Sequence, residues 1–226
     1  MRTMTMVRVE RIGAEAQPLA IVDDFVPDPD ALRRYATAAD FVPALHHYPG
    51  VRAALPADYL AHQLPVIEAV AAEAFGRAGP VTIVDASFSI VSTPAGALSL
   101  PQRLPHVDAF AADRIALVHY LSPQDGDGTA FYRHRATGFE TVDEARRDLF
   151  FRHLDTEMRY GGTPPPAYMQ GDTPLFECVR SEPARYNRAL FYRSWNLHSG
   201  AISPDNPLSA DPGAGRLTVT AFLSVG

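Results

Sequence analysis

Two histidines and an aspartate have the types and the spacing of ligands for a divalent metal ion. His106 and Asp108 stand two positions apart, and in an extended chain residues i and i+2 point to the same face. His198, far downstream in Ser194–Gly200, is the best third ligand. Two histidines and one carboxylate hold one face of an octahedral Fe(II) ion and leave its other positions open. We therefore predict a catalytic iron site built from His106, Asp108 and His198.

The last segment of the chain carries a candidate receptor for a carboxylate. Arg216 and Thr218 lie two positions apart in Gly215–Thr220, so a strand would point both toward one face. A guanidinium binds both oxygens of a carboxylate, and a neighbouring hydroxyl adds a third hydrogen bond. This pair suits the far carboxylate of 2-oxoglutarate, whose keto-acid end would chelate the iron.

Each of these residues also has a simpler interpretation. An isolated His-Xaa-Asp occurs by chance in many proteins, and His198 could bond to the backbone at a strand end. Arg216 could form a structural ion pair, and Thr218 is a good strand former in any case. The order of all the motifs along the chain favours the functional interpretation.

The composition excludes several other kinds of chemistry. The chain has 226 residues, a net charge of −6 and 46% hydrophobic residues, with 20 arginines and no lysine. Lysine-dependent catalysis and a Walker-type phosphate site are excluded, and no basic surface indicates nucleic acid. The single cysteine, Cys178, cannot form an internal disulfide. Without a secretory pattern or a run of apolar residues long enough to span a bilayer, we expect a cytoplasmic protein with no membrane partner.

The N-terminal part is predicted to be mainly helical. A short apolar strand in Pro18–Val26 leads to a helix that begins with Asp28 as its N-cap and ends near Ala39. A second helix is expected over Ala61–Arg77, where apolar residues recur at helical spacing. The stretch Phe41–Asp58 between the two helices has no clear pattern and is predicted to be irregular.

The remainder of the chain alternates as short strands with one helical insertion. We predict a mainly β fold with flanking helices, in which a double-stranded β-helix (a jelly roll, cupin-like) forms the core. The whole chain, 1–226, is expected to be one domain, with helical support from 1–80 and a core over 81–226 that is interrupted by an insertion over 137–182. The expected strands are 81–93, 114–121, 128–133, 186–192, 196–202 and 216–225, and the expected helix is 142–159.

These motifs together resemble the Fe(II)/2-oxoglutarate-dependent oxygenases, in particular their prolyl-hydroxylase-like branch. The matching pieces are IVDDFVPDPDALRRYA, the HVD segment, ALVHYLSP with GTAFYR, RALFYRSWNLHSG and GRLTVTAFLSV. A bacterial subgroup with a Tyr-Pro-Gly-Val-Arg run, here Tyr48–Arg52, is the expected place within the superfamily. Two features depart from the pattern: the long segment between Asp108 and His198, and the absence of the lysine that many relatives use where Arg216 stands here.

The resemblance implies a dioxygenase that uses Fe(II), 2-oxoglutarate and O₂ to hydroxylate an amino acid, a peptide or protein side chain, or a small metabolite. It also implies that Tyr120 adds a hydroxyl to the cosubstrate pocket. Arg133, His134 and Trp195 are candidate contacts for the substrate, and the helical insertion is a candidate dimer surface. Two alternatives stay open: a jelly-roll binding module without redox activity, and a cupin-type metalloenzyme that does not use 2-oxoglutarate.

Overall fold

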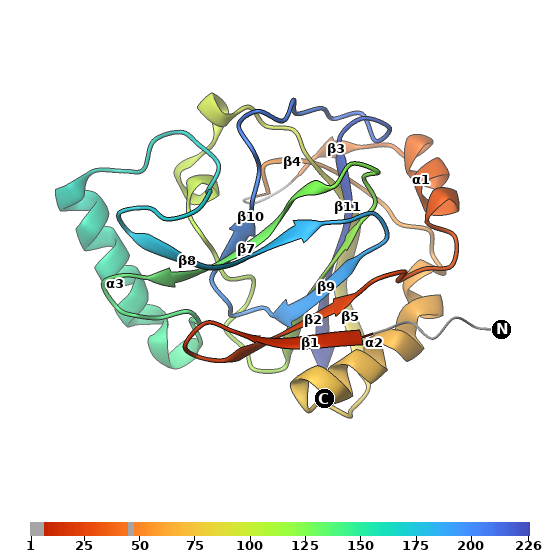
Figure 1. Ribbon diagram of the computed structural model, residues 1–226, viewed down its shortest axis with the longest axis horizontal. Coiled ribbons are helices and arrows are strands. Elements are labelled where there is room, and N and C mark those ends of the chain that lie inside the picture. The colour runs from red at the N-terminus through yellow and green to blue at the C-terminus, as the bar shows by residue number, and fades with distance from the viewer. Residues whose placement is uncertain (1–6, 45–47) are drawn as a thin grey trace.

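Two antiparallel sheets form the framework of the protein in the computed structural model, which describes residues 7–44 and 48–226 (Figure 1). The predicted jelly-roll fold with flanking helices is confirmed. The large sheet has the strand order β1-β2-β9-β6-β11-β5-β4-β3, and the small sheet has the order β10-β7-β8. The strands of the large sheet are β1 (Val7–Ile12), β2 (Gln17–Val22), β3 (Val42–Pro43), β4 (Gly50–Ala53), β5 (Val81–Val91), β6 (Arg114–Tyr120), β9 (Ala189–Arg193) and β11 (Arg216–Val225). Those of the small sheet are β7 (Gly126–His134), β8 (Phe176–Ala184) and β10 (His198–Gly200).

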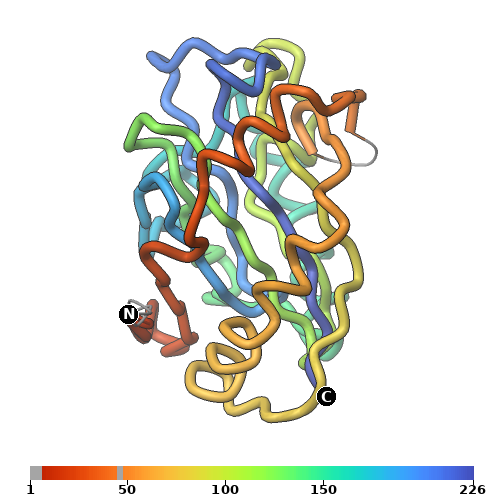
Figure 2. Tube along the Cα trace, turned by 90° about the vertical axis from the view of Figure 1, so that its right-hand side faces the viewer, coloured from red at the N-terminus to blue at the C-terminus, as the bar shows by residue number. Residues whose placement is uncertain are grey.

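Alternation along β11 divides the large sheet into a helix-facing side and a polar side. Leu217, Val219 and Leu223 are fully buried in the main hydrophobic core, where they pack with residues of two helices. These helices are α1 (Pro29–Thr37) and α2 (Tyr59–Phe75), and α2 lies along the outside of the sheet in Figure 2. The opposite side of β11, which carries Arg216 and Thr218, faces the small sheet.

The local signals for the N-terminal helices are confirmed. The Asp28 side chain accepts a hydrogen bond from the backbone N–H of Ala31 at 2.8 Å, and Pro29 occupies the first turn of α1. Helix α2 ends at Gly76, which has a left-handed φ of 64° that a glycine adopts without strain. None of the helices in the described residues is both long and apolar enough to cross a membrane.

The structure differs from the sequence prediction in three segments. The stretch predicted to be irregular contains β3 and β4, and β1 was not predicted at all, so the N-terminal part also supplies strands to the large sheet. The predicted insertion contains α3 (Glu144–Gly161) but then β8, which pairs with β7. These strands are short or rich in charged residues, so any apolar alternation in them is too brief or too interrupted to predict a strand. Two short 3₁₀ helices, Ala95–Ala97 and Leu100–Arg103, precede His106.

Candidate metal centre and adjoining cavity

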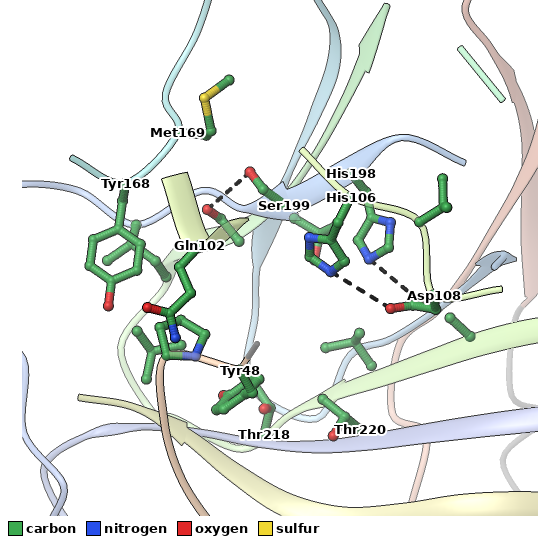
Figure 3. Close-up of a pocket in the computed structure, with 18 of the residues that line it drawn as sticks. Tyr48, Gln102, His106, Asp108, Tyr168, Met169, His198, Ser199, Thr218 and Thr220 are labelled. Carbon is green, nitrogen blue, oxygen red and sulfur yellow. Dashed lines mark hydrogen bonds and ion pairs between the residues drawn. The ribbon is translucent and has the colours of Figure 1, made fainter. Parts of the chain in front are cut away.

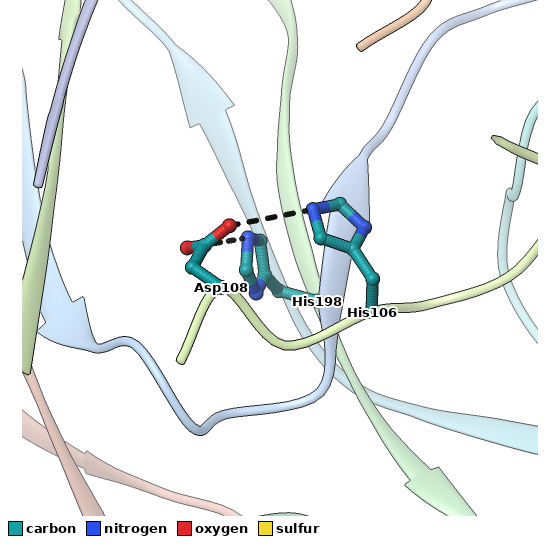
Figure 4. A group of neighbouring side chains, drawn as sticks. All are labelled: His106, Asp108 and His198. Carbon is teal, nitrogen blue, oxygen red and sulfur yellow. Dashed lines mark ion pairs between the residues drawn. The ribbon is translucent and has the colours of Figure 1, made fainter. Parts of the chain in front are cut away.

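Backbone pairing brings the three predicted ligands together (Figure 4). His198 is the first residue of β10, and His106 exchanges two backbone hydrogen bonds with it, each 2.9 Å long. The N–H of Asp108 donates to the carbonyl of Ser194 at 2.8 Å. As a result, one potential ligand atom from each of the three side chains lies within 4.8 Å of the others. The Asp108 carboxylate is 3.6 Å from Nε2 of His106 and 3.4 Å from Nε2 of His198.

The orientation of His198 suits a metal ligand. Its Nδ1 lies 2.8 Å from the carbonyl oxygen of Asn196, and a carbonyl can only accept a hydrogen bond. Nδ1 therefore carries the hydrogen, and Nε2 presents its lone pair to Asp108. Burial lowers the pKa of His198 to about 4, so the imidazole is neutral at pH 7 and able to coordinate.

Asp108 is a buried carboxylate with too few hydrogen-bond partners to balance the cost of its burial. Its side chain is 13% exposed, and Oδ2 is buried with no hydrogen-bond partner among the described residues. Burial raises its pKa to about 6. Because an uncompensated buried carboxylate is costly, a cation beside it would be stabilising. Two imidazole nitrogens and one carboxylate oxygen suit a divalent transition metal, so the residues present fit the iron that the sequence predicts.

A cavity of about 450 Å³ adjoins the three ligands and extends between the two sheets (Figure 3). Its volume is in the range that holds a small organic molecule. In Figure 3, Tyr48, Thr218 and Thr220 lie on the opposite side of the cavity from the metal ligands. Apolar side chains complete its lining, among them Leu104, Met169, Ile202 and Phe222.

Arg216 and Thr218 both line this cavity, but other groups already use part of their hydrogen-bonding capacity. Arg216 donates from Nε to the carbonyl of Asp127 at 2.8 Å and from Nη2 to that of Gly128 at 2.9 Å. Its Nη1 donates to no other described residue. The Thr218 hydroxyl donates to the carbonyl of Ser89 at 3.1 Å. In this arrangement Thr218 has no hydrogen left for a ligand, contrary to the expectation from sequence.

Tyr120 lies behind Arg216 and does not line the cavity. Its ring centroid is 5.4 Å from the Arg216 guanidinium, and its hydroxyl is hydrogen-bonded to Thr129 at 2.8 Å. The side chain is on the same face of β6 as Val118, which does line the cavity. The alternation along β6 therefore predicted the correct face of the sheet for Tyr120, but the cavity ends before it reaches this residue. Its position supports Arg216 and offers no direct contact with a ligand.

The structure also places the three candidate substrate contacts outside the cavity. Arg133 is paired with two glutamates, Glu140 and Glu177. His134 is fully buried, and its Nε2 lies 2.7 Å from a carboxylate of α3. Trp195 donates from Nε1 to Gln17 at 3.3 Å. All three have structural partners and none of them lines the cavity, so the proposed site does not include them.

Two cavity residues of the Tyr48–Arg52 run were not predicted as functional. The hydroxyl of Tyr48 is buried at the cavity wall, close to the side chains of Thr218 and Ser89. Arg52 lies over the Tyr48 ring, with its guanidinium 4.8 Å from the ring centroid. Between them, Gly50 allows β4 to approach β5, because a Cβ at this position would be 1.9 Å from the carbonyl oxygen of Ile90. That glycine, beside an aromatic residue and an arginine, was the available sequence signal.

Comparisons with known proteins support the fold. The family model described as "Family of unknown function (DUF6445)" matches residues 3–223. No curated protein matches the chain in sequence. Among solved structures, HygX from Streptomyces hygroscopicus, crystallised with nickel, 2-oxoglutarate and hygromycin B, is 11% identical with a TM-score of 0.52, and the match covers 93% of this chain and 84% of HygX.

Two further solved structures are similar at lower scores. AviO1 from Streptomyces viridochromogenes is 15% identical with a TM-score of 0.49, over 95% of this chain and 90% of AviO1. An N-substituted L-amino acid dioxygenase from Burkholderia ambifaria is 11% identical with a TM-score of 0.45, over 100% of this chain and 96% of that protein. At such identities the likeness concerns the fold alone, and the argument for the fold rests on HygX. The prolyl-hydroxylase-like branch stays a prediction.

Proposed function

We propose that this chain, which belongs to the family of unknown function DUF6445, is an Fe(II)- and 2-oxoglutarate-dependent dioxygenase that hydroxylates a small molecule. The observation that carries the proposal is the convergence of His106, Asp108 and His198 beside a cavity whose wall holds an arginine. The buried Asp108 carboxylate, which has an oxygen without a partner, supports a resident cation.

In this proposal the protein holds the metal through Nε2 of the two histidines and the carboxylate of Asp108. When bound, iron and 2-oxoglutarate would supply the oxidising power for C–H hydroxylation by O₂, with release of succinate and CO₂. The hydrogen bond from Nδ1 of His198 to the Asn196 carbonyl fixes the imidazole in its coordinating tautomer. His106, whose side chain is 54% exposed, forms the open side of the centre.

The far carboxylate of 2-oxoglutarate is proposed to bind Arg216, with Tyr48 as a second donor. Two backbone carbonyls orient the guanidinium, and its Nη1 donates to no other described residue. Burial raises the pKa of Tyr48, although the charge of Arg216 nearby opposes the rise. The phenol is therefore protonated at neutral pH and able to donate. Thr218, which the sequence favoured, would then shape the wall beside them.

The intact set of ligands also favours an enzyme over the alternatives. A binding module that had kept only the fold would not need three ligands that converge on one point. A cupin-type enzyme without 2-oxoglutarate would leave unexplained a cavity arginine that is fixed by two carbonyls.

Formation of succinate tests the proposal. We expect the purified protein, supplied with Fe(II), 2-oxoglutarate and O₂, to release succinate slowly without a substrate. His198→Ala should abolish the release, and Arg216→Gln should raise the KM for 2-oxoglutarate at least tenfold, because a charge-assisted bond is lost. His62→Ala, at an exposed position of α2, is the matched control and should behave as wild type. Equal succinate from wild type and His198→Ala would refute the proposal.

A further inference from the structure

The cavity contains a second arginine, Arg52, which the proposed cosubstrate site does not use. Arg52 lies on β4, which pairs with β5, whereas Arg216 lies on β11, on the other side of β5. Both side chains line the cavity. The two guanidiniums thus reach the same space from strands that are separated by one intervening strand.

Arg52 is largely buried, and no hydrogen bond to a described residue satisfies its guanidinium. Its side chain is 25% exposed, its Nε is buried without a hydrogen bond, and no described residue accepts a hydrogen bond from its other nitrogens. By contrast, Arg188, which is 2% exposed, has a carboxylate oxygen within 2.9 Å of each of its three nitrogens. A guanidinium left without acceptors is costly, and it is a ready receptor for a carboxylate.

Two neighbours keep Arg52 in place. The Tyr48 ring packs against the guanidinium at 4.8 Å, an arrangement that stabilises a cation through the face of the ring. The carboxylate of Asp85, another lining residue, lies 3.6 Å from Nη1, which is within ion-pair range but too far for a hydrogen bond. Arg52 is therefore oriented while its hydrogen-bond donors stay available.

Arg52 and the three metal ligands line the same cavity. A ligand held at Arg52 would thus share this space with the metal centre, as the molecule that is oxidised requires.

We infer that Arg52 binds the carboxylate of the oxidised substrate and that this substrate is an α-amino acid. The inference rests on the proposed function and names the substrate class of the same site. Asp85 favours an amino acid over a dicarboxylic acid, because its carboxylate would attract an ammonium group and repel a second carboxylate. An α-amino acid carries both groups on one carbon, so it can meet Arg52 and Asp85 together. The apolar part of the lining would receive its side chain.

A binding assay under nitrogen tests this inference. The protein is loaded with Fe(II) and 2-oxoglutarate, and each proteinogenic α-amino acid is added, followed by the matching deaminated acid and decarboxylated amine. Binding is measured from the change in the visible spectrum of the loaded protein and from the shift in its Tm. We expect at least one amino acid to bind, its deaminated acid to bind more weakly, and its amine not to bind.

Variants assign the binding to the two charged residues. Arg52→Gln should weaken binding of that amino acid about 10- to 100-fold and change the affinity for 2-oxoglutarate much less, because only the substrate loses a charge-assisted bond. Asp85→Asn should reduce the preference for the amino acid over its deaminated analogue. Arg34→Gln, on an exposed part of α1, is the control and should match wild type.

Three results would overturn the inference. In the first, no member of the panel binds to protein that has bound 2-oxoglutarate, which rejects the substrate class and leaves the proposed function intact. In the second, Arg52→Gln binds the amino acid as tightly as wild type does. In the third, Arg52→Gln no longer binds 2-oxoglutarate, which would show that Arg52 belongs to the cosubstrate site. Absence of 2-oxoglutarate binding in the wild type would instead reject the proposed function itself.

Discussion

The buried carboxylate of Asp108 makes the candidate centre favourable for a cation. Its carboxylate is nearly buried, one oxygen has no partner among the described residues, and both neighbouring imidazoles are within 3.6 Å. Burial pushes the pKa of Asp108 up and that of His198 down, each toward its neutral form. A divalent ion would reverse this preference at Asp108, because opposite charge favours the ionised carboxylate.

The first prediction concerns Asp108→Asn in the metal-free protein at pH 8. The amide has the same shape and no charge, so the cost of burying an unpartnered carboxylate disappears. We expect the free energy of unfolding to rise by about 1–3 kcal/mol, measured by urea denaturation in the presence of a chelator. Addition of Fe(II) should then stabilise wild type, by about 2.7 kcal/mol at 100 times the Kd, and leave the variant unchanged. A less stable variant in chelator would contradict this account of the site.

Several site residues could be predicted from the sequence because their signals are local. His106 and Asp108 lie two positions apart, and the last strand carries Arg216 on its polar face. The sequence does not show how far the cavity extends along a strand. Tyr120 was therefore assigned to the pocket, although it lies outside the cavity and its hydroxyl is hydrogen-bonded to Thr129. Arg133 was likewise predicted without knowledge of its carboxylate partners, Glu140 in the following loop and Glu177 on β8.

At the scale of elements, the approach of β4 to β5 positions one wall of the cavity. Gly50 pairs with Val91, and Arg52 pairs with Ser89 two residues later. Sequence prediction missed β4 because it has four residues and lies in a segment rich in proline and tyrosine. The β11 strand, in contrast, was predicted with its observed bounds, since an apolar residue stands at every second position from Leu217 to Val225.

The second prediction uses the close contact at Gly50. A methyl group there would collide with the carbonyl of Ile90 on β5, so Gly50→Ala must push the strands apart. We expect a loss of about 1–3 kcal/mol in the free energy of unfolding and weaker ligand binding in the cavity, because Tyr48 and Arg52 move with β4. Thermal unfolding and ligand titration provide the measurements. Gly96→Ala, where the added methyl meets open space, is the matched control. Equal effects of the two substitutions would show that the contact has no such role.

At the scale of the whole molecule, a buried polar chain connects the helices to the large sheet. Nδ1 of His119 lies 2.9 Å from the Tyr59 hydroxyl of α2, and its Nε2 lies 3.1 Å from the side-chain oxygen of Asn187. The Asn187 amide in turn donates to the carbonyl of Val26 at 2.9 Å. His119 is fully buried and contacts Tyr59 and Phe25 on the helix side of the sheet.

The third prediction is loss of stability in acid through His119. Burial lowers its pKa from 6.5 to about 4, so between these values the unfolded chain binds a proton that the folded protein does not. The stabilisation is therefore present above pH 6.5 and is lost as the pH falls toward 4, by up to roughly 3 kcal/mol. His119→Gln should flatten this part of the profile of unfolding free energy against pH. His153→Gln, at an exposed position of α3, should reproduce the wild-type profile, and a His119→Gln profile as steep as wild type would refute the assignment.

An anaerobic titration of the metal-free protein with Fe(II) and then 2-oxoglutarate, followed by visible absorption, tests directly whether His106, Asp108 and His198 hold iron. Three ligands on one face leave room for a bidentate keto acid, so we predict a metal-to-ligand charge-transfer band that saturates at one 2-oxoglutarate per chain. The band should be absent in His198→Ala and should need more 2-oxoglutarate in Arg216→Gln. Absence of the band in wild-type protein that has bound iron, or an unchanged band in His198→Ala, would contradict the account.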